Sequence, residues 1–218
     1  MTLPSISALL VDDHALLRAG IRVLLSTTEH IVLVGEASKA EQGIQLYQQL
    51  LPDIVIMDLS MPGIGGLEAI RRILLHDDQA KILVFSVHHE AVFVNRALQA
   101  GAKGYITKNS APSLLIEAIN SVVNAEIYIE TGLLSHDDIG EPTGDHASVI
   151  NSFSPREFDV YRLLAQGLTV NAIADQLCLQ QKTVSNYATQ IKKKLGVQTF
   201  TELAHIASSL GLLSHSRM

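Results

Sequence analysis

Cysteine is almost absent from this chain of 218 residues, because Cys178 is its only one. A single cysteine excludes an internal disulfide framework. The nine histidines show no spacing, to cysteine or to one another, that is typical of a zinc site. With 47% hydrophobic residues, the chain can instead bury an apolar core.

Long apolar runs are also missing. No charged-then-apolar leader opens the chain, and no uncharged apolar segment is long enough to suggest a membrane span. We therefore expect a cytoplasmic protein with no membrane partner.

Positive charge is scarce in the first part of the chain. Residues 1–149 hold nine Lys and Arg against eighteen Asp and Glu, a net −9, whereas residues 150–218 hold seven against four, a net +3. The two parts therefore have different electrostatic partners. Between them, residues 135–145 are acidic, contain two glycines and a proline, and show neither hydrophobic period. The predicted organisation is a first domain over residues 1–127, a linker over residues 128–150 and a second domain over residues 151–218.

Short apolar runs alternate with helical patterns through the first domain. Such runs, bounded by polar or turn residues, are typical of buried strands, and intervening helices make the sheet parallel. Right-handed crossovers then place helices on both faces. We predict an α/β fold with a doubly wound, five-stranded parallel sheet of the flavodoxin-like type. The expected strands are residues 8–11, 32–37, 54–58, 82–86 and 104–107, and the expected helices are residues 15–26, 39–50, 66–75, 91–100 and 111–125.

Polar residues stand where these strands end. Asp12 and Asp13 follow the first run, Asp58 closes the third, Ser86 closes the fourth, and Lys108 follows the fifth. Open α/β sheets bind ligands at the carboxyl ends of their strands, so these side chains are expected to converge. Three carboxylates there would repel one another unless a hard divalent cation lay among them. Mg²⁺ is the expected ion.

Phosphoryl transfer needs such an arrangement, with an in-line nucleophile and positive charge on the equatorial oxygens. Asp58 is the predicted nucleophile, because an ionised carboxylate can form an acyl phosphate. The predicted Mg²⁺ ligands beside Asp58 are Asp13 and the backbone carbonyl of Ser60. Asp12 is expected to bind the ion directly or through water. Lys108 is expected to pair with the phosphoryl oxygens.

Four more side chains are expected to respond to the phosphoryl group or to affect it. Ser86 carries a hydroxyl that can move toward a new phosphoryl group, and Tyr105 can fill the space that Ser86 leaves. Ser60 and His88, two residues beyond Asp58 and Ser86, are predicted to face the phosphoryl group and to tune its lifetime.

Each of these residues also has a simpler interpretation. Asp13 could cap the helix that begins near Ala15, and Asp58 and Lys108 could be ordinary turn and surface residues. The joint placement of the set at four strand ends favours the phosphoryl-accepting site. An aspartate-dependent phosphohydrolase is a rival, but Ser60 stands where a second carboxylate would be needed. We therefore do not expect an enzyme.

Three segments of the first domain resemble the receiver domain of two-component response regulators. They are residues 11–14 (VDDH), 57–63 (MDLSMPG) and 100–108 (AGAKGYITK). The likeness spans the whole first domain. By position it implies that Asp12 and Asp13 are the acidic pair and that Asp58 is the phosphoacceptor. It also implies that Ser86 and Tyr105 are the switch residues and that Lys108 is the phosphate-contacting lysine.

Helical patterns without strands fill the second domain. Ser154 precedes Pro155 and lies three residues before Glu157, a combination typical of a capped helix start. Gly167 and Gly196 lie just past two expected helices, where a left-handed residue is usual. We predict a small all-α domain of four helices over residues 155–165, 171–177, 181–195 and 200–210.

The helix expected at residues 181–195 is amphipathic. Val184, Ala188, Ile191 and Leu195 recur at i, i+4, i+7 and i+11 and form its buried stripe. With the short helix before it and the tight turn over residues 178–180, it makes a helix-turn-helix pattern. The N-terminal half of such a helix reads base edges, while its lysines neutralise phosphates, although a lysine run alone is also typical of a solvated face. The predicted DNA contacts are Lys182, Thr183, Ser185, Asn186, Thr189, Lys192 and Lys193.

The second domain resembles the LuxR-type helix-turn-helix in five segments. They are residues 154–157 (SPRE), 163–167 (LLAQG), 173–177 (IADQL), 182–184 (KTV) and 193–197 (KKLGV). The full chain is therefore similar to a NarL/FixJ-type response regulator, and residues 60–69 with Tyr187 look most like the GacA/UvrY-type subgroup. The sequence departs from the family at Ala172, Gln180 and Phe200. Gln180 is a poor helix cap where serine or threonine is usual, so the recognition helix is expected to begin differently.

The resemblance implies a transcription regulator that receives a phosphoryl group from a sensor histidine kinase. It also implies a homodimer on paired half-sites of double-stranded DNA, with RNA polymerase as a further candidate partner. The alternative is a DNA-binding regulator that does not use phosphorylation and keeps the receiver as a dimerisation module. The complete acidic and lysine set argues against this alternative.

Overall fold

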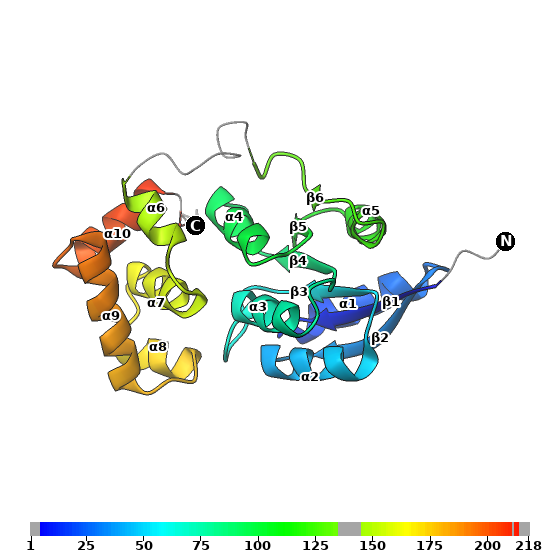
Figure 1. The fold of residues 1–218 in the computed structure, drawn as a ribbon, viewed down its shortest axis with the longest axis horizontal. Coiled ribbons are helices and arrows are strands. Elements are labelled where there is room, and N and C mark those ends of the chain that lie inside the picture. Colours follow the sequence, from blue (N-terminus) through cyan, green and yellow to red (C-terminus); the bar gives the residue numbers. More distant parts are fainter. Residues whose placement is uncertain (1–4, 135–144, 211, 214–218) are drawn as a thin grey trace. The chain divides into compact units, whose positions relative to one another are not determined.

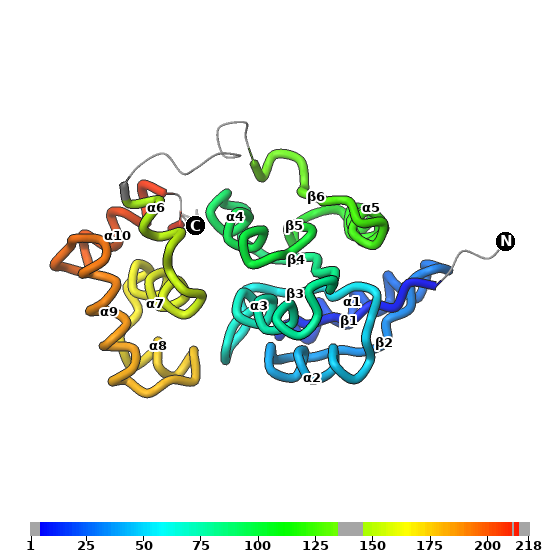
Figure 2. The backbone as a smooth tube through the Cα atoms, viewed as in Figure 1, coloured from blue at the N-terminus to red at the C-terminus, as the bar shows by residue number. Residues whose placement is uncertain are grey.

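The structure is a computed structural model that describes residues 5–134, 145–210 and 212–213. The chain folds as two compact units, traced in Figure 2, and each is described by itself. The first unit is formed by residues 1–133 apart from residues 90–92, and the second mainly by residues 134–218.

A parallel sheet lies at the centre of the first unit (Figure 1). Its strands are β1 (Ile6–Val11), β2 (Ile31–Ala37), β3 (Ile54–Met57), β4 (Ile82–Ser86), β5 (Gly104–Thr107) and β6 (Tyr128–Ile129). The strand order is β2-β1-β3-β4-β5-β6, and every pairing is parallel. The winding direction reverses between β1 and β3, and ligands of open α/β sheets bind in the crevice at such a switch point.

Helices cover both faces of this sheet, as the sequence predicts. They are α1 (Ala15–Ser26), α2 (Ala40–Leu50), α3 (Gly66–His76), α4 (Ala91–Gln99) and α5 (Pro112–Val123). Adjacent strand residues point to opposite faces. Leu10 therefore joins the core under α1 and α5, whereas Val11 packs against Gly43 of α2, where a methyl group would lie 2.8 Å from the valine.

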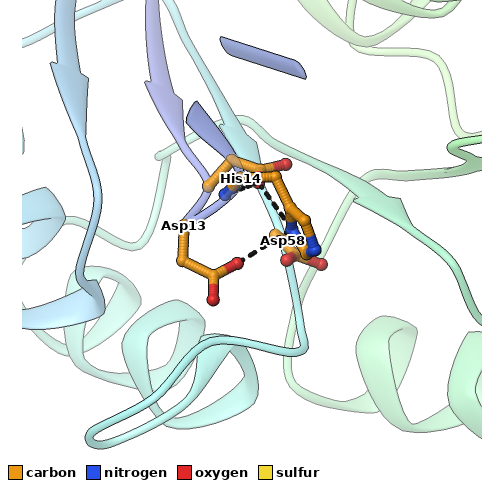
Figure 3. A group of neighbouring side chains, drawn as sticks. Asp13, His14 and Asp58 are labelled. Atoms are coloured by element: carbon orange, nitrogen blue, oxygen red, sulfur yellow. Dashed lines mark hydrogen bonds and ion pairs between the residues drawn. The ribbon is translucent and has the colours of Figure 1, made fainter. Parts of the chain in front are cut away.

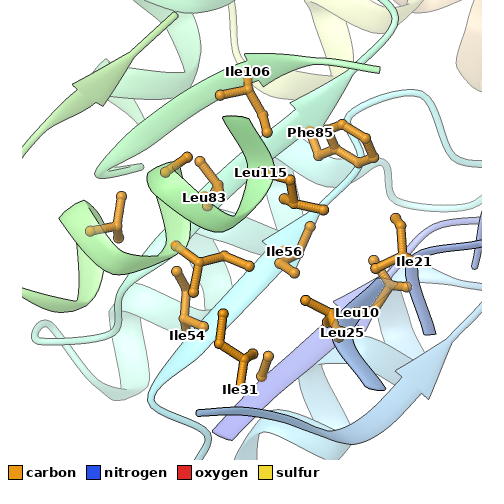
Figure 4. Packing of buried hydrophobic residues seen from close by; sticks show 14 residues of the cluster. Leu10, Ile21, Leu25, Ile31, Ile54, Ile56, Leu83, Phe85, Ile106 and Leu115 are labelled. Carbon is orange, nitrogen blue, oxygen red and sulfur yellow. The ribbon is translucent and has the colours of Figure 1, made fainter. Parts of the chain in front are cut away.

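The core under α1 and α5 holds the sheet and these helices together (Figure 4). Leu10, Ile56 and Leu83 come from three neighbouring strands and are fully buried. Ile21 of α1 and Leu115 of α5 cover them. Each buried side chain of this size contributes about 2 kcal/mol relative to exposure.

The central strand β3 consists of four apolar residues, each with an exposed fraction of 0%. Burial on both faces is the reason that its sequence does not alternate. Its register with β1 is continued by a hydrogen bond from the Asp58 amide to the Val11 carbonyl, with an N to O distance of 2.9 Å. The core thus places the ends of β1 and β3 side by side.

The sheet has six strands, where the sequence led us to expect five. The sixth, β6, lies in the segment predicted as linker, and its parallel partner is β5. Two residues are too few to show a period, so the strand is visible only from its pairing. A helix not predicted, α6 (Asp145–Asn151), also begins within that segment. The acidic stretch that suggested the linker lies largely outside the described residues.

The second unit contains α6 and four further helices, α7 (Pro155–Ala165), α8 (Val170–Gln176), α9 (Gln181–Leu195) and α10 (Phe200–Ser209). Ser154 and Glu157 form the predicted capping box at the start of α7. The α9 helix ends at Gly196, which has a φ of 69°. Val184, Ala188, Ile191 and Leu195 are the buried residues of α9, so its predicted stripe is confirmed.

Candidate functional site

The predicted polar residues meet at the carboxyl ends of the strands in the first unit. Asp12 and Asp13 follow β1, and Asp58 follows β3, at the switch point of the sheet. Figure 3 shows Asp13, His14 and Asp58 gathered there. One carboxylate oxygen from each of the three aspartates and one nitrogen of His14 all lie within 4.8 Å of one another.

Lys108 brings a positive charge into this cluster. Its Nζ lies 2.7 Å from Asp12 Oδ2 and 2.8 Å from Asp58 Oδ2. Both contacts are ion pairs. Both aspartates have exposed fractions of 1%, and buried charges need such a partner.

Burial raises the pKa of Asp58. The Lys108 ammonium and a hydrogen bond from the Ser60 amide lower this pKa, whereas the negative charge of Asp12 raises it further. The net effect is a raised pKa. A divalent cation beside Asp58 would favour the ionised form of the carboxyl group.

The donor set fits a hard divalent cation. Three carboxylates converge, and among the described residues Asp13 Oδ1 is buried and accepts no hydrogen bond. The oxygens of Asp12 and Asp58 that face Lys108 also accept none in the described part of the chain. Magnesium and calcium prefer oxygen ligands of this kind.

Asp13 does not act as the helix cap that the simpler interpretation suggested. The N-terminal cap position of α1 is His14, which makes no capping bond through its side chain. Sequence reasoning assigned His14 no role. Its Nδ1 lies 3.0 Å from Asp13 Oδ1 and 3.3 Å from Asp12 Oδ1, contacts that are ion pairs only when the imidazole is protonated.

The two expected switch residues are both fully buried. Ser86 ends β4, and its Oγ accepts a hydrogen bond of 3.3 Å from the amide of His88. The Tyr105 hydroxyl donates to the carbonyl of the same His88 at 2.9 Å. Tyr105 is thus already buried in this structure, and its movement into the space that Ser86 leaves stays a prediction.

Ser60 and His88 are brought together in the structure. Ser60 Oγ lies 2.7 Å from His88 Nε2, and the Ser60 amide donates to Asp58 Oδ1 at 3.2 Å. The imidazole is stacked on the Phe93 ring of α4, with centroids 3.8 Å apart. The role of the Ser60 carbonyl as a metal ligand stays a prediction.

An apolar hollow of about 660 Å³ adjoins the Lys108 side of the cluster. It lies between α1 and the start of α5, and Lys108 and Ser110 form part of its lining. Leu16 and Val23 of α1, with exposed fractions of 89% and 64%, extend the apolar surface. Contiguous exposed surface of this kind is typical of protein interaction sites.

The predicted DNA-contacting residues of the second unit all lie on α9, away from its buried stripe. Lys182, Ser185, Asn186, Thr189 and Lys193 are exposed, and Thr183 and Lys192 are half-buried. Gln180 occupies the N-cap position and makes no side-chain capping bond, in agreement with its poor capping tendency.

Three side chains of α9 are partly engaged within the unit. The Thr189 hydroxyl donates to the Ser185 carbonyl at 2.9 Å. Lys192 Nζ donates to the Gln198 carbonyl at 3.3 Å and lies 5.1 Å from the centre of the Phe200 ring. Lys194 Nζ lies 2.6 Å from Glu157 Oε1, so its charge is paired within the unit.

Comparison with known proteins identifies both units. Residues 8–120 match the family described as response regulator receiver domain, and residues 151–207 match bacterial regulatory proteins of the luxR family. The chain therefore belongs to the NarL/FixJ-family response regulators of two-component systems, which are DNA-binding transcription regulators and not enzymes.

Individual relatives match along nearly their whole length. The transcriptional activator protein ExaE of Pseudomonas putida is 40% identical over 209 residues, which are 94% of this chain and 97% of ExaE. The response regulator UvrY of Escherichia coli K12 is 39% identical over 95% of both chains. The response regulator GacA of Pseudomonas aeruginosa is 37% identical over 95% of this chain and 98% of GacA.

Solved structures show the same likeness. RcsB from Salmonella enterica serovar Typhimurium, bound to promoter rprA in the presence of the phosphomimetic BeF3-, is 27% identical and has a TM-score of 0.65, covering 94% of this chain and 98% of RcsB. A two-component response regulator of the LuxR family from Aurantimonas sp. SI85-9A1 is 39% identical, with a TM-score of 0.58, over 59% of this chain and 92% of that chain. None of the helices in the described part of the chain is long and apolar enough to cross a membrane.

Proposed function

We propose that this response regulator accepts a phosphoryl group from a sensor histidine kinase on Asp58. The observation that carries the proposal is the placement of the Lys108 ammonium within 2.8 Å of both the Asp58 and the Asp12 carboxylates, at the switch point of the sheet. The receiver would span residues 1–127, the linker residues 128–150 and the DNA-binding domain residues 151–218.

Asp58 is the nucleophile in this reaction. A carboxylate oxygen attacks the phosphorus of the kinase phosphohistidine, the new O–P bond forms as the N–P bond breaks, and the electron pair of that bond remains on the departing imidazole. Lys108 moves from its carboxylate partners to the phosphoryl oxygens, where its charge offsets theirs. Ser86 then moves to hydrogen-bond the phosphoryl group, and Tyr105 fills the space that Ser86 leaves.

Mg²⁺ is the proposed cofactor, and its donors are Asp12, Asp13, Asp58 and the backbone carbonyl of Ser60. When bound, it supplies positive charge beside the transferring phosphoryl group. The three converging carboxylates support this assignment, as does the buried Asp13 Oδ1, which accepts no hydrogen bond within the described part of the chain.

The second unit then carries the output. Helix α9 enters the major groove of double-stranded DNA, where Ser185, Asn186 and Thr189 face the base edges. Lys182, Thr183, Lys192 and Lys193 contact the sugar-phosphate backbone. We infer a cytoplasmic regulator that acts as a homodimer, with RNA polymerase as a further partner. The complexes of RcsB with promoter DNA support the DNA-binding part of this proposal.

Mass spectrometry of the intact full chain tests the acceptor. Incubation with Mg²⁺ and acetyl phosphate is expected to add the mass of one phosphoryl group to the wild type and none to Asp58→Ala. Asp78→Ala, which removes an exposed carboxylate, is the matched control and should be modified like the wild type. Phosphorylation should also raise the dimer fraction in sedimentation or the affinity for duplex DNA.

The opposite outcome supports the phosphorylation-independent alternative. If the folded wild type gains no mass with Mg²⁺ present, and Asp58→Ala binds duplex DNA as the wild type does, the receiver serves as a dimerisation module.

A further inference from the structure

The chain does not leave the first unit directly after α5. Residues 128–130 return to the edge of the sheet, where β6 pairs with β5. The Tyr128 amide donates to the Lys103 carbonyl at 3.1 Å, and the Glu130 amide donates to the Tyr105 carbonyl at 3.0 Å. The segment is therefore attached to the strand that carries Tyr105 and leads into Lys108.

The side chain of Glu130 adds a second attachment, at the turn that holds Lys108. Its Oε2 accepts a hydrogen bond of 2.7 Å from the Thr107 amide, and its Oε1 accepts one of 2.6 Å from the Ser110 hydroxyl. The Ser110 and Thr107 hydroxyl oxygens lie 2.8 Å apart. One carboxylate thus spans residues 107–110, on both sides of Lys108.

These hydrogen bonds satisfy a backbone group that needs a partner. Thr107 has an exposed fraction of 7%, and a buried N–H without an acceptor destabilises a fold. Hydrogen bonds to an ionised acceptor are shorter and stronger than neutral ones. On the other side of the turn, the Lys108 amide donates to the Ser86 carbonyl at 2.7 Å. The backbone around Lys108 is therefore held by Ser86 and by Glu130.

From this geometry we propose that Glu130 is a positioning residue for Lys108, and that it transmits the movement of Lys108 to the chain leaving the receiver. The inference rests on the proposed function, because it assumes that Lys108 shifts toward a phosphoryl group on Asp58. When Lys108 moves, the turn over residues 107–110 moves with it. Glu130, bonded to this turn through its carboxylate and to Tyr105 through its amide, is then displaced at the first residue beyond β6.

The chain offers two informative variants and a matched control. Glu130→Ala removes both side-chain hydrogen bonds. Glu130→Gln keeps an acceptor for the Thr107 amide and can donate to Ser110, so it should restore the turn without the charge. Glu126→Ala removes the same charge four residues earlier, from an exposed side chain that forms no hydrogen bond or ion pair with the described residues.

The first readout is the rate of phosphorylation of the full chain by acetyl phosphate with Mg²⁺, followed by intact mass. Loss of two hydrogen bonds that orient Lys108 is expected to slow Glu130→Ala about tenfold. Glu130→Gln and Glu126→Ala are expected to stay close to the wild-type rate. Melting temperatures, measured in parallel, identify any variant that does not fold.

The second readout is the response of backbone amides to beryllofluoride with Mg²⁺, measured by NMR. In the wild type and in Glu130→Gln, the amide signals of Thr107 and of residues 128–130 should shift together. In Glu130→Ala the Thr107 signal should still respond, while the response of residues 128–130 should be lost. A general loss of stability would not separate the two responses.

Three results overturn the inference. A wild-type phosphorylation rate in folded Glu130→Ala would refute it while leaving Asp58 as the acceptor. Equal slowing of Glu130→Gln and Glu126→Ala would show an effect of net charge rather than of the hydrogen bonds. Absence of mass gain in the wild type would refute the proposed function and this inference together.

Discussion

Gly66 begins α3 next to the backbone of Asp58. A methyl group at this position would lie 2.1 Å from the Asp58 carbonyl oxygen and 2.7 Å from the Leu59 Cα, which is nearer than nonbonded atoms approach. Both neighbours are backbone atoms and cannot rotate away. The absence of a side chain at Gly66 therefore allows the backbone of Asp58, the proposed acceptor, to lie where it does.

Gly66→Ala is expected to reduce phosphorylation by acetyl phosphate by more than tenfold, because a displacement of about 1 Å can cost a hundredfold in rate. The same change should lower the stability of the receiver by 1 kcal/mol or more, as overpacking does at about 1–3 kcal/mol. Intact mass over time and urea unfolding measure the two effects.

Gly20→Ala is the matched control on the same unit. Gly20 lies within α1 and a methyl group there would meet nothing within 4 Å. Alanine is favoured over glycine in a helix by about 1 kcal/mol, so this variant should be more stable than the wild type and phosphorylated normally. Destabilisation by both substitutions would contradict the assignment of the Gly66 effect to its contact with Asp58.

At the scale of elements, the start of helix α7 is held through Glu157, which binds both Ser154 nearby and Lys194 of α9. The Ser154 amide donates to Glu157 Oε2 at 2.8 Å, while the other oxygen of Glu157 accepts from Lys194 of α9 at 2.6 Å. Burial acts to raise the pKa of Glu157, but the hydrogen bonds from Lys194 and Ser154 outweigh it. The pKa of Glu157 is therefore lowered on folding.

A lowered carboxyl pKa has a defined effect on stability. The contribution is fully present above the pKa of the unfolded chain, about 4.3, and is lost as the pH falls through the lower folded value. Glu157→Gln should therefore lose about 1 kcal/mol of stability at pH 7 and lose less than the wild type on acidification. Hydrogen exchange of the α7 amides between pH 3 and pH 7, a window chosen around the pKa of about 4.3, measures this difference.

The glutamate of the second capping box serves as control. Glu202 caps α10 together with Thr199 but is exposed and has no lysine partner among the described residues. Glu202→Gln should thus change the stability less than Glu157→Gln. Equal effects at both positions would mean that Lys194 contributes nothing to the start of α7.

Helices and strands with a hydrophobic pattern in their sequence could be predicted, whereas a strand defined only by its pairing with another strand could not. The ends of the five predicted strands and five predicted helices of the receiver agree with the structure within two residues, because apolar runs and periodic patterns define them. Tyr128 and Ile129 carry no such pattern, and they form a strand only because β5 offers an unpaired edge.

Some residues of the candidate site could likewise be predicted from the sequence, and others could not. Asp12, Asp13, Asp58, Ser86 and Lys108 could be placed together because each stands at the end of a recognisable strand. Contacts made by loops depend on the tertiary fold, so the bonds from Ser60 to His88 and from Glu130 to the Lys108 turn could not be foreseen. His14 was visible in the sequence, beside two aspartates, but its ring orientation was not.

At the scale of the whole molecule, the two units differ in charge. Positive charge in the second unit is concentrated on α9, but its lysines are not equivalent. Lys182, Lys193 and Lys194 are all exposed, but Lys194 alone of the three is paired with Glu157. Only unpaired lysines displace counterions from DNA at full effect.

The salt dependence of DNA binding separates these roles. For the full chain on duplex DNA, Lys182→Ala and Lys193→Ala should each reduce the slope of log K against log salt by about one. Lys194→Ala should leave the slope nearly unchanged, although it removes the same charge. A slope reduced equally by all three variants would contradict the internal pairing of Lys194 in the DNA-bound protein.

The turn between α8 and α9 has a practical consequence for such measurements. Its left-handed residue, with a φ of 53°, is Cys178, which is exposed. Because the sequence contains no other cysteine, a thiol-reactive fluorophore or spin label attaches at this one position of the natural chain. The protein thus carries a built-in attachment point for a spectroscopic reporter, seven residues before Ser185, the first of the side chains predicted to face the base edges.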